Sequence, residues 1–155
     1  AVIAHYYAIA AYTGRSFAVS SLVRMLKAHG ASFPPATLQQ ALDALTVQAK
    51  SGHVGAGAAL GQMYVTGVPF GHDLEKAQMY LALMPAGKNP KAALRLGITL
   101  LSDPEDKAQG HPAARAALAK AAAGSDLGTS LTATTLLGQL DTPVAQAPPT
   151  PKATP

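Results

Sequence analysis

The sequence predicts an all-α protein, arranged as a right-handed α-solenoid of about three to four stacked helix-turn-helix repeats. The first observation that indicates this fold is a set of four glycines spaced 38, 35 and 37 residues apart: Gly14, Gly52, Gly87 and Gly124. Each of them ends an alanine-rich stretch that suits a helix. Self-similarity with a period of about 30 to 40 residues is typical of stacked helix pairs. A second is composition, because 48% hydrophobic but only 5% aromatic residues suit packing between small side chains. No run has the sustained period-two alternation of a strand.

The stretch after each of these glycines is expected to be the first helix of a unit. Four and eight residues after the first two glycines stand an alanine and a leucine: Ala18 and Leu22, then Ala56 and Leu60. Positions four apart share one helical face, so the small and the large side chain form a groove and a ridge for a neighbouring helix. After Gly87 this pattern returns one residue late. After Gly124 the leucine-glycine pair, Leu137-Gly138, comes later still, so the fourth unit is the least regular.

The stretch before each glycine is expected to be a second helix. The chain begins with Ala1–Tyr7 inside such a helix. We therefore expect a preceding repeat or a partner to cover the first helix, because a solenoid unit hides its apolar face only against a neighbour.

Residues 49–87 resemble the Sel-one-like repeat, a relative of the tetratricopeptide repeat. The matching positions, in order, are Ala49, Gly52, Ala56, Leu60-Gly61, Tyr64, Gly67-Val68, Asp73, Lys76-Ala77 and Tyr80. The resemblance extends in register over about residues 1–140, although residues 102–106 replace the glycine-valine loop of the family in the third unit. It implies an α-solenoid that acts as an adaptor between proteins.

The motif residues have expected structural roles. Gly61 and Gly97 lie inside predicted helices, where glycine costs about 1 kcal/mol relative to alanine, so we expect another helix to approach them closely. The four periodic glycines suit the left-handed residue that ends a helix. Asp73 is expected to cap the helix that begins after it.

Residues 1–140 are predicted to be the repeat domain, and residues 141–155 a proline-rich extended or disordered tail. Five of the twelve prolines lie in residues 142–155, which is typical of a linker but also of a short proline-motif ligand. No apolar run of about 18 to 20 residues occurs, so no transmembrane segment is predicted.

The net charge of +4 and the pI near 9.5 do not by themselves indicate nucleic acid as a partner. The twelve basic residues are scattered, with no basic run, zinc finger or aromatic RNA-binding motif. We expect at most a weak attraction to an anionic partner or surface.

No catalytic residues, cofactor, metal or small-molecule substrate are predicted. Cysteine is absent, which excludes thiol nucleophiles and thiolate metal sites. None of the five histidines pairs with another at metal-binding spacing: His5, His29, His53, His72 and His111. Those beside turn glycines, which are all except His5, are expected in surface loops. The acidic cluster Asp103, Glu105 and Asp106 lacks the ligand spacing of a calcium loop, so it is expected to be a solvated turn with helix-capping acids.

Two functions follow as expectations, neither of them an enzyme. The first is a protein-protein interaction scaffold or adaptor that uses the groove between successive first helices or the exposed ends of the stack. Its candidate partner-binding residues are Arg24, Lys27, Gln62, Tyr64, Lys91 and Arg95, and for Tyr64 a place in the core is equally expected. The second is a permanently bound structural accessory subunit of a membrane-associated or envelope enzyme complex, favoured by the nearly charge-free segment Ala1–Thr13. The composition slightly favours the periplasm or cell envelope of a bacterium over the cytoplasm.

Overall fold

The computed structural model describes residues 2–142, and 78% of these residues are helical, with no strand among them. The all-α prediction is confirmed. The helices are α1 Val2–Tyr12, α2 Ser16–His29, the 3-10 helix η1 Gly30–Ser32, α3 Pro35–Lys50, α4 Val54–Thr66, α5 Leu74–Leu83, α6 Pro90–Leu101, α7 Pro104–Ala108, α8 Pro112–Ala122 and α9 Leu127–Asp141. The predicted proline-rich tail lies, from residue 143 on, outside the described residues. Within the described range, no helix has the length and apolarity needed to cross a membrane.

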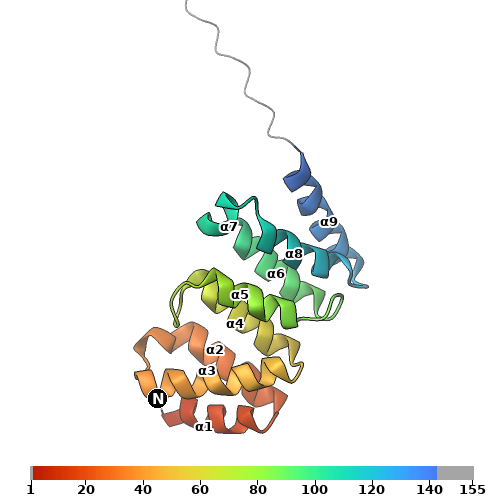
Figure 1. Ribbon diagram of the computed structural model, residues 1–155. Helices are drawn as coiled ribbons and strands as arrows, with labels where there is room; N and C mark the ends of the chain where they lie inside the picture. Colours follow the sequence, from red (N-terminus) through yellow and green to blue (C-terminus); the bar gives the residue numbers. More distant parts are fainter. Residues whose placement is uncertain (1, 143–155) are drawn as a thin grey trace, which may run out of the picture.

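The longer helices contact one another in two series. Helices α2, α4, α6 and α9 each contact the next, and we call them the first-helix layer. Helices α1, α3, α5 and α8 do the same and form the second-helix layer. Figure 1 shows the result, with α1 to α3 at one end of the molecule, α4 and α5 in the middle, and α9 at the other end. Each helix of the first layer begins two or three residues after one of the periodic glycines.

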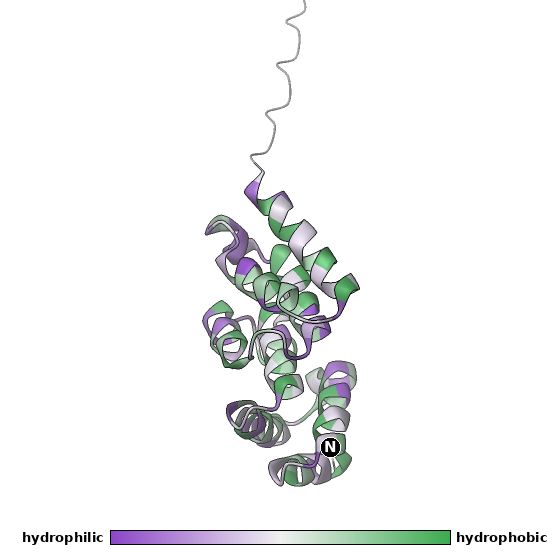
Figure 2. Cartoon of the chain, turned by 90° about the vertical axis from the view of Figure 1, so that its right-hand side faces the viewer, coloured by the Kyte–Doolittle hydropathy of each residue, from purple (hydrophilic) through white to green (hydrophobic). Residues whose placement is uncertain are grey.

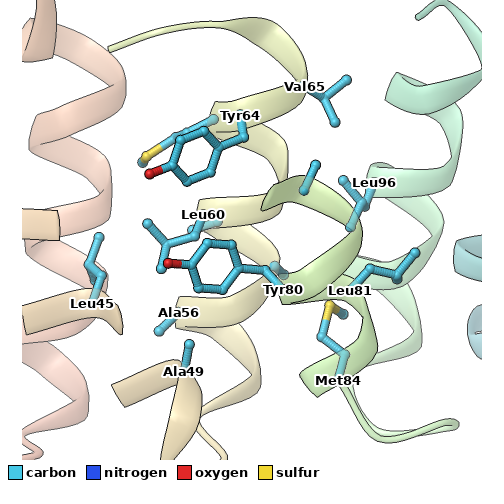
Figure 3. Packing of buried hydrophobic residues seen from close by; sticks show 14 of the residues in the cluster. Leu45, Ala49, Ala56, Leu60, Tyr64, Val65, Tyr80, Leu81, Met84 and Leu96 are labelled. Atoms are coloured by element: carbon cyan, nitrogen blue, oxygen red, sulfur yellow. The ribbon is translucent and has the colours of Figure 1, made fainter. Parts of the chain in front are cut away.

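The core is continuous between the layers and consists mainly of alanine and leucine. Large side chains with almost no exposure come from α2, α3, α4, α6 and α8 and include, in that order, Leu22, Leu45, Leu60, Leu96 and Leu118. At the centre, the rings of Tyr64 and Tyr80 stack with an interplanar angle of 6° and a centroid separation of 5.9 Å (Figure 3). The Tyr80 hydroxyl also shares a hydrogen bond of 3.0 Å with Thr46 of α3, so this buried polar group has a partner.

Two helical glycines lie at close helix contacts, as predicted. A Cβ atom at Gly97 would lie 2.8 Å from Leu118 Cδ2 of α8, and one at Gly61 would lie 3.2 Å from Leu96 Cδ2 of α6. Both distances are shorter than ordinary carbon-carbon contacts of about 3.5 to 4.0 Å. The missing side chain therefore lets the neighbouring helix approach.

The prediction for the turn glycines is right for three and wrong for one. Gly14, Gly52 and Gly87 have φ angles of +82°, +97° and +75°, in the left-handed region that favours glycine. Gly124 does not have a positive φ. It is required for another reason, because a Cβ there would lie 2.5 Å from the Cβ of Pro90 at the start of α6.

Side-chain caps fix the beginnings of several helices. Asp73 accepts a hydrogen bond of 3.0 Å from the Lys76 amide at the start of α5, which confirms its predicted role. His53, Asn89 and Asp126 cap α4, α6 and α9 in the same way, three residues before the donating amide. Each cap satisfies an amide that has no partner inside its helix.

Several hydrogen bonds between helices join residues 34 to 37 positions apart, close to the spacing of the glycines. On the second-helix layer His5 shares a bond of 2.7 Å with Gln40, and the Gln48 amide donates to the Tyr12 carbonyl. On the first-helix layer Lys27 donates to Gln62, which donates to Thr99. These bonds have separations similar to those of the periodic glycines.

Candidate functional site: a basic groove on the first-helix layer

Three successive helices of the first layer form a groove, which we call the first-helix groove. It is lined by Val23 and Lys27 of α2, Gly55, Ala58, Ala59 and Gln62 of α4, and Ala92 and Arg95 of α6. Its volume is about 130 Å³, and a neighbouring hollow of about 190 Å³ shares Lys27 and Gln62 with it. The groove exists because the floor residues are glycine and alanine, whose side chains leave space between the helices.

Gln62 holds the centre of the groove. Lys27 Nζ donates to Gln62 Oε1 at 3.1 Å, and Gln62 Nε2 donates to Thr99 Oγ1 at 3.4 Å. Thr99 in turn donates to the Arg95 carbonyl at 2.9 Å. Both ends of the Gln62 amide therefore have partners, which orients the amide and the Lys27 ammonium along the groove.

The charge of the groove is positive. Lys27 and Arg95 are both exposed and stand on opposite sides of the Gln62 amide, on α2 and α6. Among the described residues that line the groove and its neighbouring hollow, none is acidic. Guanidinium and ammonium groups in this arrangement attract carboxylates and can donate several hydrogen bonds to them.

The six candidate partner-binding residues do not all lie together. Lys27, Gln62 and Arg95 line the same groove. Arg24 is exposed one helical turn before Lys27, but it does not line the groove. Lys91 is exposed in the first turn of α6 and faces Asp126 instead. There the hydrogen bonds from Thr129, with the attraction of Lys91, hold the pKa of Asp126 below its ordinary value.

Tyr64 lies in the core, which is the second of the two places expected for it, and its side chain is not on the groove surface. It is only 3% exposed and packs between Tyr80 and Phe70. Burial, followed by the proximity of Tyr80 and Asp73, raises the pKa of its hydroxyl. The Lys76 ammonium lies 5.3 Å from the centre of its ring, so Tyr64 also supports the start of α5.

A second surface feature is the outer side of α1, which we call the α1 face. Its members are all apolar or aromatic and between 54% and 69% exposed: Val2, Ile3, Tyr6, Ile9 and Tyr12. Figure 2 shows hydrophobic colour on this end of the molecule and also on α9 at the opposite end. A hollow of about 410 Å³ beside the face is lined partly by Ile9, Tyr12 and Gln40. In the sequence, the nearly charge-free segment Ala1–Thr13 indicates this apolar face.

The acidic cluster caps helices as predicted, but it is not a solvated turn. Asp103 is 4% exposed and accepts from the Asp106 amide at 2.9 Å, while Asp106 is fully buried. Burial acts to raise the pKa of Asp103, but hydrogen bonds from Asp106 and His72 and the attraction of His72 hold it below its ordinary value. Sequence reasoning missed the contact with His72, which lies 31 positions away.

Comparison of the chain with protein-family models, with curated proteins and with solved structures found no match.

Proposed function

We propose that this protein is a non-catalytic scaffold or adaptor, a right-handed α-solenoid of Sel-one-like repeats that binds an extended acidic segment of a partner protein in the first-helix groove. The groove itself carries the proposal, because Lys27, Gln62 and Arg95 come from three successive helices and meet on one surface. The repeat assignment is supported by the periodic glycines and by hydrogen bonds that recur about one period apart.

The shape and charge of the groove favour a narrow anionic occupant. Its floor of glycine and alanine admits a polypeptide backbone or a short side chain but leaves little room for a second helix. Lys27 and Arg95 supply donors on two sides, and no acidic residue of the lining opposes a carboxylate. Complementary charge of this kind chiefly sets specificity and the rate of association.

The test uses fluorescein-labelled peptides rich in aspartate and glutamate, and matched peptides with asparagine and glutamine. In fluorescence anisotropy, the wild-type chain should bind acidic peptides, more weakly as salt rises. The double variant Lys27→Glu and Arg95→Glu should bind at least about tenfold more weakly, because like charges then face the peptide. The control variant Lys88→Glu and Lys107→Glu changes net charge equally at exposed positions outside the groove. Equal loss in both variants would exclude the groove as the binding site.

A second candidate function is the permanently bound accessory subunit, and the α1 face favours it. Exposed contiguous apolar surface is typical of a stable interface. Under this alternative, the wild-type chain in its native source is bound to a partner protein in a stoichiometric complex that resists salt. Replacing both Tyr6 and Ile9 with lysine should release that partner. The same variant should bind acidic peptides as the wild type does. Size-exclusion chromatography with light scattering, on complexes isolated through the tagged chain, distinguishes the two functions. A companion retained by that variant would contradict this alternative.

A further inference from the structure

A cluster of metal-binding groups lies away from the first-helix groove, where two loops meet. His72 belongs to the loop between α4 and α5, whereas Asp103 and Glu105 lie at the start of α7. Each of the three offers one ligand atom, and these atoms all lie within 4.8 Å of one another. The closest pair is His72 Nε2 and Asp103 Oδ2, which are 2.6 Å apart.

The separations suit a common coordination centre. In a tetrahedral zinc site, nitrogen and oxygen ligands lie about 2.0 to 2.2 Å from the metal, so they stand roughly 3.3 to 3.6 Å from each other. The His72 ring must therefore retreat by about 1 Å from Asp103 to admit an ion. The side chain can do so by a change of rotamer, because it is 42% exposed to solvent.

Asp103 is held in place to receive an ion. Its side chain is 2% exposed, and its other oxygen, Oδ1, accepts the Asp106 amide, which leaves Oδ2 directed at His72. Supporting hydrogen bonds of this kind orient metal ligands and raise affinity. Glu105 is exposed and adds the third ligand from the first turn of α7.

We propose that His72, Asp103 and Glu105 form a binding site for a divalent transition-metal ion of the Zn²⁺ class. One imidazole nitrogen with two carboxylates suits such ions, whereas Mg²⁺ and Ca²⁺ prefer oxygen ligands alone. Water fills the remaining coordination position. The ion replaces a single hydrogen bond with a cross-link between the α4–α5 loop and α7. It thereby stabilises the junction between two helix pairs, independently of any partner in the groove.

The first experiment titrates the full chain with Zn²⁺ in isothermal titration calorimetry at pH 7. We expect one ion per chain, because the three side chains form a single coordination centre. His72→Ala should weaken Zn²⁺ binding at least about tenfold, as should Glu105→Gln, since each removes a ligand. His29→Ala, which removes an exposed histidine elsewhere, should leave binding unchanged.

Thermal unfolding separates ligation from folding. His72→Ala also removes a hydrogen bond to Asp103 and lowers the Tm without metal, whereas Glu105 is exposed and makes no side-chain hydrogen bond in the described structure. Zn²⁺ should raise the Tm of the wild type and of His29→Ala, and should fail to raise that of Glu105→Gln at the same concentration. Absence of Zn²⁺ binding by the wild type at millimolar concentration would overturn the proposal, as would equal affinities in all variants.

Discussion

Gly97 shows how one missing side chain determines a helix contact. An alanine there would gain about 1 kcal/mol of helix propensity but would place Cβ within 2.8 Å of the fully buried Leu118. Overpacking of this kind costs about 1 to 3 kcal/mol, so Gly97→Ala should lower the free energy of unfolding. Urea denaturation followed by circular dichroism measures the change.

The matched control is Gly138→Ala in α9, where no atom of residues 2–142 beyond its chain neighbours and the local helix backbone lies within 4 Å of the added methyl group. This variant should be as stable as the wild type or more stable, by up to about 1 kcal/mol. Equal stability of the two alanine variants would contradict the close-contact explanation of Gly97.

Asp103 should make the stability of the protein depend on pH in the acid range. Its pKa in the folded state is lowered by hydrogen bonds and by His72, relative to about 3.9 in the unfolded chain. Its contribution is therefore complete well above pH 4 and is lost as the pH falls through the folded-state pKa. The free energy of unfolding, measured between about pH 6 and pH 3, should fall more steeply in the wild type than in Asp103→Asn. Identical slopes would show that Asp103 does not contribute.

Local residue roles could be predicted where the cause lies within one helix or one turn. Asp73 was predicted as a cap because its acceptor and its amide lie three residues apart. The contact of His72 with Asp103 could not be found in this way, because it joins two loops 31 positions apart and depends on how the helix pairs pack. The same packing buries Asp106, which the sequence alone presents as one acid among three.

At the scale of elements, Asp106 joins the short helix α7 to α8. Its carboxylate is fully buried and accepts the Ala113 and Ala114 amides at 2.8 and 2.9 Å, at the positive end of α8. Asp106→Asn replaces one acceptor with an amide donor that faces another donor. We expect a loss of about 2 to 3 kcal/mol in the free energy of unfolding, measured in urea.

Asp43→Asn is a suitable control for this element, because Asp43 is exposed on α3 and accepts only from Gln39 within the described residues. Its effect should stay within about 0.5 kcal/mol. A comparable loss in both variants would indicate that removal of negative charge, rather than the contact with α8, is responsible.

The order of the elements could be predicted well, and the groove in part. Repeated offsets from the glycines placed Lys27, Gln62 and Arg95 on helices that the structure brings together. The same offsets could not tell whether Tyr64 faces the groove or the core, because both faces of α4 contact other helices. Most positions of α4 are buried, so the helix lacks the contrast between a polar and an apolar side that would indicate its orientation from the sequence.

For the whole molecule, the arrangement predicts a gradient of local stability. Helix α4 contacts α2, α3, α5 and α6, whereas the outer sides of α1 and α9 expose large apolar residues such as Ile3 and Leu131. Amide hydrogen exchange should therefore be slowest in α4 and faster at both ends. Mass spectrometry of peptic fragments measures this, and uniform protection from α1 to α9 would contradict it.

The hydrogen bonds between residues 34 to 37 positions apart also limit how such a chain can change in length during evolution. His53 and Asn89 cap α4 and α6 in the same way, and the residues from one cap to just before the next number 36. Because donors and acceptors lie one unit away, loss or duplication of this whole segment preserves the spacing of partners on either side. A deletion of any other length changes the separation of every pair that spans it. Under the proposed repeat architecture, selection should thus accept changes in the number of units far more readily than insertions or deletions within one unit.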